Sequence, residues 1–368
     1  MYFFVRYLYK LFSLKKPLLI LLFSYSLLSH SQSIRKYSNE FLNIGVDAAA
    51  LGMSNAVTAN TNDVNACYWN PAGLIHLENK QIAAMHASYF ANIAQYDYAA
   101  YAAPIDDLSA WGISAIRFGV DNILNTTQLI DNQGLIDYNR VSLFSVADYG
   151  FTFSYARKSK LSDFRYGVNS KVVRRVIGNF ASSWGFGFDV GFQYEKNDWK
   201  YGLMLRDITT TYNIWNIDET EFATIKNAIP GQNQDLPETT EITAPKAQFG
   251  LSRKIEFHAD YTLLASMNLN MQFTKTNDYI SSSFVSIDPA FGFEGGYNDL
   301  AFLRLGIGNF QNVTSIDRTK SLSFQPNIGL GFKYRGIQVD YALTNLAKQS
   351  QALYSNVFSV KVDLSIFR

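Results

Sequence analysis

The sequence predicts an all-β protein, a transmembrane antiparallel β-barrel of about 14 strands with a small N-terminal plug inside its lumen. Apolar residues alternate with polar or small ones over many short segments after residue 80. Aromatic residues make up 15% of the 368 residues, which suits the girdles of a membrane barrel. The connections between the segments are mostly short and long in turn, a pattern typical of outer-membrane proteins.

Residues 1–31 have the pattern of a secretory signal peptide. Four basic residues precede an apolar run at 17–28, and Ser29 and Ser31 occupy the small-residue positions of a cleavage site. The run is shorter than the roughly 20 apolar residues of a membrane-spanning helix, so cleavage is favoured over the alternative, an uncleaved anchor. We expect the mature chain to begin near Gln32 and to reach the outer membrane of a Gram-negative cell.

Charge and cysteine content limit the partners that can be expected. The leader holds four of the 32 Lys and Arg residues, which leaves 28 against 31 Asp and Glu, a net charge of about −3. This balance does not suggest nucleic acid as a partner. The densest basic stretch, "KVVRR" at 171–175, is expected to be a solvated or headgroup-facing strand end. The expected surroundings are outer-membrane lipid and lipopolysaccharide, and the single Cys67 excludes an intramolecular disulfide.

Residues 32–79 are too irregular for membrane strands and are expected to form the plug. Side chains alone fill a barrel of only about eight strands, so a barrel of 14 needs a filler. In "NPAG", Pro71 would fix the first position of a turn or helix that Asn70 could cap. Tyr68 and Trp69 supply bulk and hydrogen-bonding groups. Cys67 is expected to be a small buried residue of this plug.

The barrel itself is expected over residues 80–368. In "SWGFGFDVGFQYE" (183–195), large apolar side chains alternate with Gly, Asp, Gln and Glu, and the small, polar face suits a barrel lumen. Segments of this kind lie at 80–90, 94–103, 109–118, 148–158, 164–175, 183–195, 199–207, 245–254, 260–272, 286–297, 299–309, 323–334, 335–343 and 353–367.

The connections between these segments predict the orientation of the barrel. Links after the even-numbered segments are short, and most links after odd-numbered ones are longer, the largest at 119–147 and 208–244. The link after the first segment is short and breaks the rule. Since periplasmic turns are short and extracellular loops long, both ends of the barrel sequence should lie on the periplasmic side.

No catalytic constellation is found. After loss of the leader, His76, His86 and His258 remain, without metal-ligand spacing, so we expect no enzyme activity, no metal and no cofactor. His86 could serve a Ser–His hydrolase, but a lumen or interface histidine is the favoured interpretation. A divalent-ion site in the acidic loop 208–244 is a weaker alternative to a solvated loop. The acidic residues in question are Asp218, Glu219, Glu221, Asp235, Glu238 and Glu241.

Two blocks carry a family resemblance. "FLNIGVDAAALGMSNA" (41–56) and "DVNACYWNPAGL" (63–74) resemble the opening of the PorV/PorQ family of Bacteroidota outer-membrane proteins, relatives of the FadL long-chain fatty-acid transporter. Agreement with that pattern lies at Phe41, Leu42, Gly45, Ala48, Gly52, Met53, Asp63, Ala66, Trp69, Asn70, Pro71 and Ala72. From these blocks we take as plug motif Gly45, Gly52, Met53, Asp63, Trp69, Asn70, Pro71, Ala72 and Gly73. Arg368 after Phe367 departs from the terminal aromatic residue common in outer-membrane barrels.

The resemblance implies a FadL-like barrel with a plug and leaves two functions open. The favoured one is an accessory of type IX protein secretion that binds secretion-system proteins or secreted cargo through its extracellular loops. The alternative is a transporter of hydrophobic small molecules, whose ligand would contact Leu51, Met53, Tyr68 and Trp69. A sealed, polar lumen would favour partner binding, and an apolar tunnel or a kinked, laterally open wall would favour transport.

Overall fold

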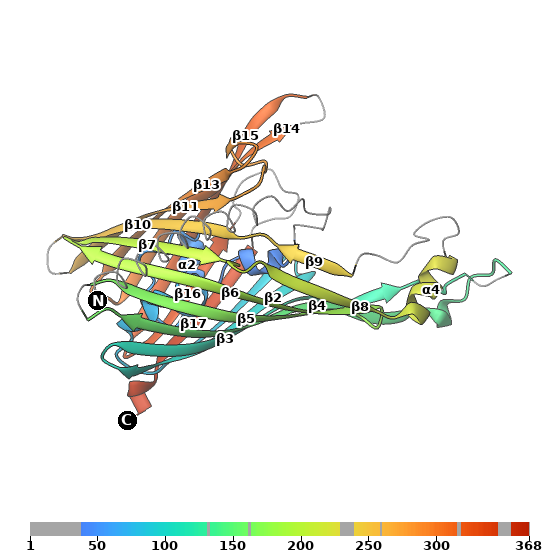
Figure 1. Cartoon of the computed structure of the whole chain (residues 1–368), viewed down its shortest axis with the longest axis horizontal. Coiled ribbons are helices and arrows are strands. Elements are labelled where there is room, and N and C mark those ends of the chain that lie inside the picture. The colour runs from blue at the N-terminus through green and yellow to red at the C-terminus, as the bar shows by residue number, and fades with distance from the viewer. Residues whose placement is uncertain are drawn as a thin grey trace, which may run out of the picture. The chain divides into compact units, whose positions relative to one another are not determined.

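The computed structural model describes residues 38–130, 133–160, 163–228, 239–257, 260–314, 318–344 and 355–367. The expected signal peptide, His258, Asp235, Glu238 and Arg368 lie outside these ranges. The described chain forms a closed antiparallel barrel (Figure 1). Closure is made by β1, which pairs with β2 on one side and with β17 on the other. The predicted barrel is therefore confirmed.

Fourteen strands form the ring, as predicted. They are β1 (Gln81–Tyr89), β2 (Ala94–Asp106), β3 (Ser109–Asn125), β4 (Ser142–Lys158), β5 (Arg165–Ile177), β6 (Ala181–Lys196), β7 (Trp199–Arg206), β10 (Lys246–Phe257), β11 (Tyr261–Gln272), β13 (Ser286–Tyr297), β14 (Ala301–Thr314), β15 (Lys320–Tyr334), β16 (Ile337–Thr344) and β17 (Ser355–Asp363). Short elements accompany them: η1 (Glu40–Asn43), α2 (Ala48–Gly52), α3 (Ala66–Trp69), η2 (Pro71–His76), η3 (Tyr138–Arg140), β8 (Thr211–Ile217), α4 (Glu219–Ala228), β9 (Thr240–Thr243), β12 (Ile280–Ser281) and η4 (Leu364–Phe367). No helix among the described residues is both long and apolar enough to cross a bilayer.

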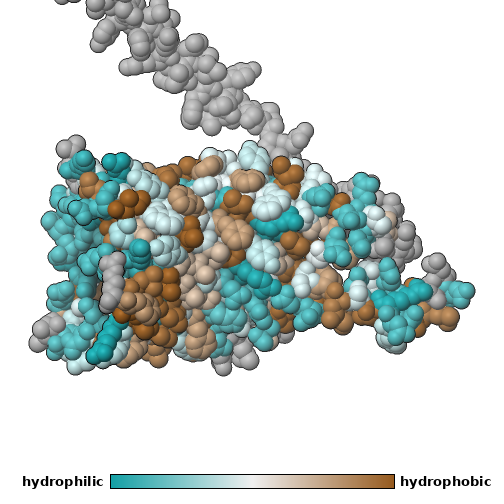
Figure 2. All heavy atoms as spheres, turned by 90° about the horizontal axis from the view of Figure 1, so that it is seen from below, coloured by the Kyte–Doolittle hydropathy of each residue, from teal (hydrophilic) through white to brown (hydrophobic). Residues whose placement is uncertain are grey.

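The two faces of the wall follow the alternation in the sequence. In β6, Gly187 and Asp189 are buried toward the lumen, whereas Trp184 and Phe186 are 50% and 61% exposed on the outer face. On the face shown in Figure 2, hydrophobic residues gather beside a hydrophilic end of the barrel. A closed barrel with an apolar outer face is the architecture of Gram-negative outer-membrane proteins, which confirms the predicted location.

Some strands extend further into the predicted long loops than the sequence suggested. β3 and β4 continue to pair up to Asn125 and Ser142, so 119–125 and 142–147 of the predicted loop 119–147 are strand. A bulge between Val120 and Ile123 shifts the register there and interrupts the alternation that marks a strand. The predicted loop 208–244 likewise contains β8, α4 and β9. Strands that leave the bilayer keep pairing because each satisfies the backbone groups of the other.

The wall is interrupted between β7 and β8. β6 pairs with β7 over Val190–Lys196 and with β8 over Ala181–Phe186, and residues 207–210 bulge between the two pairings. The backbone N–H of Asp207 donates to the Asp189 carboxylate at 2.8 Å, and that of Ile208 to the Phe188 carbonyl at 3.0 Å. The interruption is therefore filled by hydrogen bonds.

Lys171 closes this interruption on the lumen side. Its ammonium group lies 2.7 Å from a carboxylate oxygen of Asp189 and 2.7 Å from one of Asp207. The expectation that 171–175 is a solvated or headgroup-facing strand end is wrong for Lys171, which is buried. Two carboxylates facing a single lumen position make burial of this cation possible.

Candidate functional site

Residues 38–79, here called the lumen segment, lie against the inner face of the wall. Lumen-facing glycines mark the points of closest approach. A Cβ on Gly167 would lie 2.6 Å from the Pro71 carbonyl carbon, and one on Gly250 would lie 2.7 Å from the Ala59 nitrogen. Gly202, Gly292 and Gly306 meet the segment backbone in the same way, and Gly191 meets the Asn70 side chain and the Pro71 ring. Backbone packed on backbone at so many strands leaves the segment no room to shift without moving the wall.

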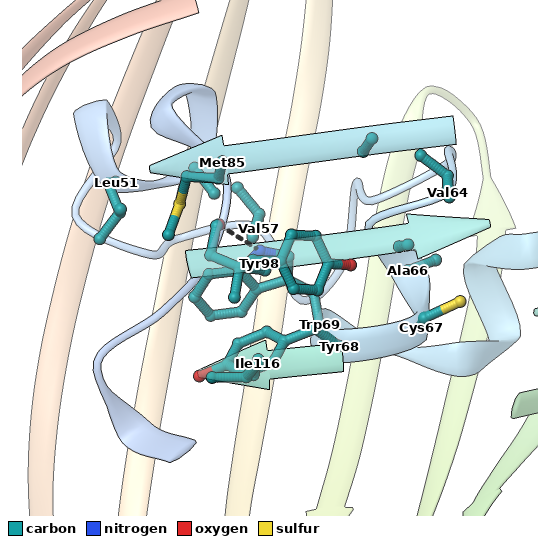
Figure 3. Close-up of a cluster of buried hydrophobic side chains, with 14 of the residues drawn as sticks. Leu51, Val57, Val64, Ala66, Cys67, Tyr68, Trp69, Met85, Tyr98 and Ile116 are labelled. Carbon is teal, nitrogen blue, oxygen red and sulfur yellow. Dashed lines mark hydrogen bonds between the residues drawn. The ribbon is translucent and has the colours of Figure 1, made fainter. Parts of the chain in front are cut away.

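The core of the lumen segment is built around Trp69, which is 3% exposed. Its indole N–H donates to the Val46 carbonyl at 3.1 Å, and its ring meets that of Tyr68 edge-on at 4.8 Å. Figure 3 shows Tyr68 and Trp69 among buried side chains of the segment and of the strands β1 to β3, including Tyr98 and Ile116. The two aromatic residues thus tie distant parts of the segment together and pack them against the wall.

Asn70 joins the lumen segment to the wall directly. Its side-chain amide donates to the Thr58 carbonyl at 3.0 Å and to the Phe192 carbonyl of β6 at 3.0 Å. The side-chain oxygen Oδ1 of Asn70 accepts from the Ala72 N–H at 3.2 Å, which caps η2. Pro71 stands at the start of that helix. The cap that the sequence predicted at "NPAG" is present, and its second role as a wall contact is new.

The remaining motif residues have packing roles. Gly45 adopts φ +103°, where a side chain would be strained, and a Cβ there would lie 3.1 Å from the Trp69 ring. Gly52 lies against Gly329 of β15, and Gly73 is pressed against the Thr61 carbonyl. Met53 is buried beneath Gly292 and Gly306 of the wall. Ala72 and Cys67 are completely buried, and burial raises the pKa of the Cys67 thiol to about 12.

Charged groups also join the lumen segment to the wall. Asp63 forms an ion pair with Lys361 of β17, and the Ser359 hydroxyl donates to the Asp47 carboxylate at 2.8 Å. Burial, together with the nearby carboxylates of Asp340 and Asp63, raises the pKa of Asp47 to about 6. Lys361 and the Ser359 bond oppose this shift. Asp47 is therefore a carboxyl group that titrates close to neutral pH.

A cavity lies on each side of the lumen segment. One, of about 380 Å³, is lined toward the short turns by residues such as Gln81, Lys333 and Asp363. The other, of about 400 Å³, is lined toward the long loops by residues such as Gln272, Asn309 and Thr344. We call them the periplasmic cavity and the extracellular cavity. Each is of the size that binds small molecules.

The predicted ligand contacts all line one or both cavities. Met53 lines the periplasmic cavity, Leu51 and Tyr68 line the extracellular one, and Trp69 lines both. That they touch a ligand stays a prediction. Polar groups predominate in the lining of the extracellular cavity, the lining of the periplasmic cavity is mixed, and neither cavity is an apolar tunnel.

Sequence reasoning missed the cations of the lumen. Arg206 donates to the Tyr68 carbonyl at 2.9 Å and to the Gln248 side chain at 2.9 Å, and its guanidinium lies 4.6 Å from the centre of the Tyr68 ring. Arg304 contacts Asp340 at 2.6 Å. Both arginines stand at lumen positions in otherwise apolar strand sequences, "YGLMLR" and "FLRLG". A charge at a lumen position was the available signal, because it needs a buried partner.

The histidines and acidic loop residues that the structure describes do not form a reactive site with one another. His86 lies on the outer face with Nδ1 2.7 Å from the Asp97 carboxylate. Burial and the charges of Arg165 and Lys200 lower the pKa of His76 to about 4. Glu241 pairs with Arg175 at 3.2 Å. Within the described ranges, no three His, Cys, Asp or Glu side chains are grouped so that they could hold a metal ion.

The chain is similar in fold to two channels of known structure. It superposes on the toluene transporter TodX of P. putida with a TM-score of 0.53 and 12% identity, over 87% of this chain and 98% of that one. For the monoaromatic hydrocarbon channel CymD the TM-score is 0.54 and the identity 11%, over 86% of this chain and 97% of that one. No protein-family model matches the sequence. No curated protein matches it either. The FadL-like barrel fold expected from the resemblance is thus confirmed, at the level of fold.

Proposed function

We propose that this chain is a FadL-like outer-membrane transporter, in which a small molecule crosses the lumen past the N-terminal plug. The observation that carries the proposal is the lumen segment, which lies between an extracellular and a periplasmic cavity and contributes Trp69 to both. A cavity that faces each side of one obstruction is what a gated passage requires. Of the two functions that the sequence left open, the proposal adopts the alternative, a transporter of small molecules.

The fold supports transport over partner binding, whereas the filled wall meets the criterion for a sealed lumen. TodX and CymD, which share the fold, are described as a toluene transporter and a monoaromatic hydrocarbon channel. The break between β7 and β8 is a weak point in the wall, although Lys171, Asp189 and Asp207 fill it in this structure. A hydrophobic substrate is the class implied by the resemblance. The polar lining of the extracellular cavity is the feature that fits that class least.

Uptake by whole cells tests the proposal. The chain is expressed in a Gram-negative host that lacks its own general porins, and entry of toluene, hexanoate and maltotriose is compared with entry into cells carrying the empty vector. Faster entry of at least one probe is expected, with saturation at high probe concentration. If no probe enters faster than in the control, although the barrel is present and folded in the outer membrane, the transport function is wrong.

A second function is favoured by one specific observation. The β3–β4 hairpin presents large apolar side chains to solvent at its extracellular end. Leu124, Leu135 and Leu143 are 64%, 61% and 62% exposed, and Tyr138 is 76% exposed. Exposed apolar groups of this kind suit a protein partner, such as a component or cargo of type IX secretion.

Affinity capture tests this second function. The native chain and a Leu135→Ser/Tyr138→Ser variant are purified from outer membranes of the source cells in parallel. Recovery of secretion-system proteins or secreted cargo with the native chain alone is the expected result. Recovery of lipid alone with both chains would exclude it.

A further inference from the structure

The extracellular cavity has the lining of a site for polar, uncharged ligands. Eight of its lining residues are Asn or Gln, against four that carry a charge. Those charges are engaged locally: Lys246 lies 3.4 Å from the Glu40 carboxylate, and the Asp288 carboxylate accepts from the Phe310 N–H at 3.2 Å. Arg206 is held by Gln248 and by the Tyr68 carbonyl. The amides are therefore the groups best placed to receive a ligand.

The amides on one wall form a hydrogen-bonded ladder. The Gln311 amide donates to Asn309 at 2.8 Å, and the Asn309 amide donates to Gln325 at 3.3 Å. Gln325 in turn donates to Asn327 at 3.4 Å, and Asn327 donates to the Ser54 hydroxyl at 2.8 Å. The ladder begins in β14, descends β15 and ends on the lumen segment. From Asn309 to Ser54 its members line the cavity, whereas Gln311 lies outside the lining.

A second group of amides lines the same cavity from other strands. Gln248 of β10 donates to Asn270 of β11 at 2.9 Å, and Gln272 follows two positions further along β11. Tyr89 adds a partly exposed aromatic ring to the lining. A solute in the cavity would thus meet amides from β10, β11, β14 and β15, which lie on one arc of the wall, together with an aromatic ring.

The chemistry of the amide group decides the class of ligand. Each amide has two donors and an acceptor, and a hydroxyl group also donates and accepts, so the two fit in either direction. An apolar molecule would strip water from the amides and return no hydrogen bond, at a cost of roughly tenfold in affinity for each amide left unpaired. Asn309 and Gln325 each use one of two N–H donors and one of two lone pairs in the ladder, so each can still pair with a hydroxyl group, whereas an ion would meet charges that are already engaged.

We propose that the extracellular cavity binds a neutral, polyhydroxylated solute of the size of a short oligosaccharide, held against the arc of wall that carries the amide ladder of β14 and β15 and the amides of β10 and β11. As a statement about what the barrel transports, this inference rests on the transporter function proposed above. As a statement about binding, it can be tested without transport.

Calorimetric titration of the purified full chain tests the site. The detergent must carry no sugar headgroup, so lauryldimethylamine oxide is used. The probes are maltotriose, a capped triglycine as a neutral peptide, and hexanoate as an amphipathic anion. Saturable binding of maltotriose is expected, with weaker or no binding of the other two. Preference for the peptide or for hexanoate, or no binding of any probe, would overturn the proposal.

Two variants locate the binding in the cavity. Gln325→Leu removes a central amide of the ladder, and Gln272→Leu removes an amide of β11. Each should weaken maltotriose binding by about five- to tenfold. Asn216→Leu, an exposed amide of β8 outside this cavity, is the matched control and should bind as the native chain does. Heat-dependent mobility on gels shows that each variant is folded. Equal affinity in all four proteins would place the site elsewhere, whereas failure of uptake alone would leave the binding result standing.

Discussion

At the scale of single residues, the Asn70 side chain forms hydrogen bonds both within the lumen segment and to the wall. It is completely buried and makes three hydrogen bonds, of which one crosses to β6. Some other side chains of the segment, such as that of Trp69, bond only within the segment. Asn70 therefore couples the fold of the segment to its position in the barrel.

Replacement of Asn70 by Ala should weaken this attachment. Asn70→Ala leaves the Phe192 carbonyl without its side-chain donor and the Thr58 carbonyl with only the longer bond from Gln193 at 3.4 Å, which should lower stability by about 2–3 kcal/mol. The loss is expected as a lower thermal midpoint and as faster proteolysis within 38–79. Asn62→Ala, in the same segment but exposed, should change neither. Equal behaviour of the two variants would show that Asn70 does not anchor the segment.

Asp47 gives the attachment a pH dependence with a defined sign. Its pKa is raised to about 6 in the fold from an ordinary value near 3.8. The folded state therefore binds this proton more tightly, so the stability from Asp47 is full at low pH and is lost as pH rises through about 6. His76, with its pKa lowered to about 4, acts in the opposite direction in much the same range.

Comparison of the native chain with Asp47→Asn isolates the carboxyl group, because His76 is present in both. Asn cannot ionise and keeps an oxygen that can accept from Ser359. The variant should gain thermal stability relative to the native chain as pH rises from 4 to 7, with most of the gain between pH 4 and 6, the interval between the unfolded and folded pKa values of Asp47. Thermal midpoints measured at intervals over this range check the prediction. A difference that does not vary with pH would mean that Asp47 does not titrate there.

At the scale of elements, the strands and the lumen segment fit through glycine. Wall glycines let the segment approach so closely that a single methyl group would collide with its backbone. A Cβ on Gly202 of β7, for example, would fall within contact distance of the Thr58 carbonyl and 2.7 Å from the Ala59 Cα. Rigid backbone is the neighbour, so the collision cannot be relieved by turning a side chain.

Gly202→Ala should therefore loosen the lumen segment without opening the barrel. A cost of about 1–3 kcal/mol is expected for the forced shift. Gly295→Ala, on β13, is the matched control because a Cβ there meets only one atom, at 4.0 Å. Limited proteolysis and amide hydrogen exchange over 38–79 measure the loosening. If both variants protect the segment equally, the contact at Gly202 does not hold it.

At the scale of the whole molecule, the barrel could be predicted from the sequence and the fit of its contents could not. Alternation along one strand is a local property, and the faces of β6 were read from it. The pair Asp47–Ser359 joins residues 312 positions apart, and no local pattern shows which wall residue a plug residue will meet. The β3–β4 extension was missed because its bulge breaks the alternation. The burial of Lys171 was missed because the carboxylates that pair with it, Asp189 and Asp207, lie in other parts of the chain.

The central claim is that the N-terminal segment is fixed in the lumen and obstructs it. Conductance of single barrels in a planar bilayer tests this claim most directly, with the native chain compared with a variant that lacks residues 38–79. A segment fixed in the lumen predicts small or no steady conductance for the native chain and a large, persistent conductance for the variant. Heat-dependent mobility on gels checks that the variant is folded. Equal conductance of the two folded proteins would contradict the account.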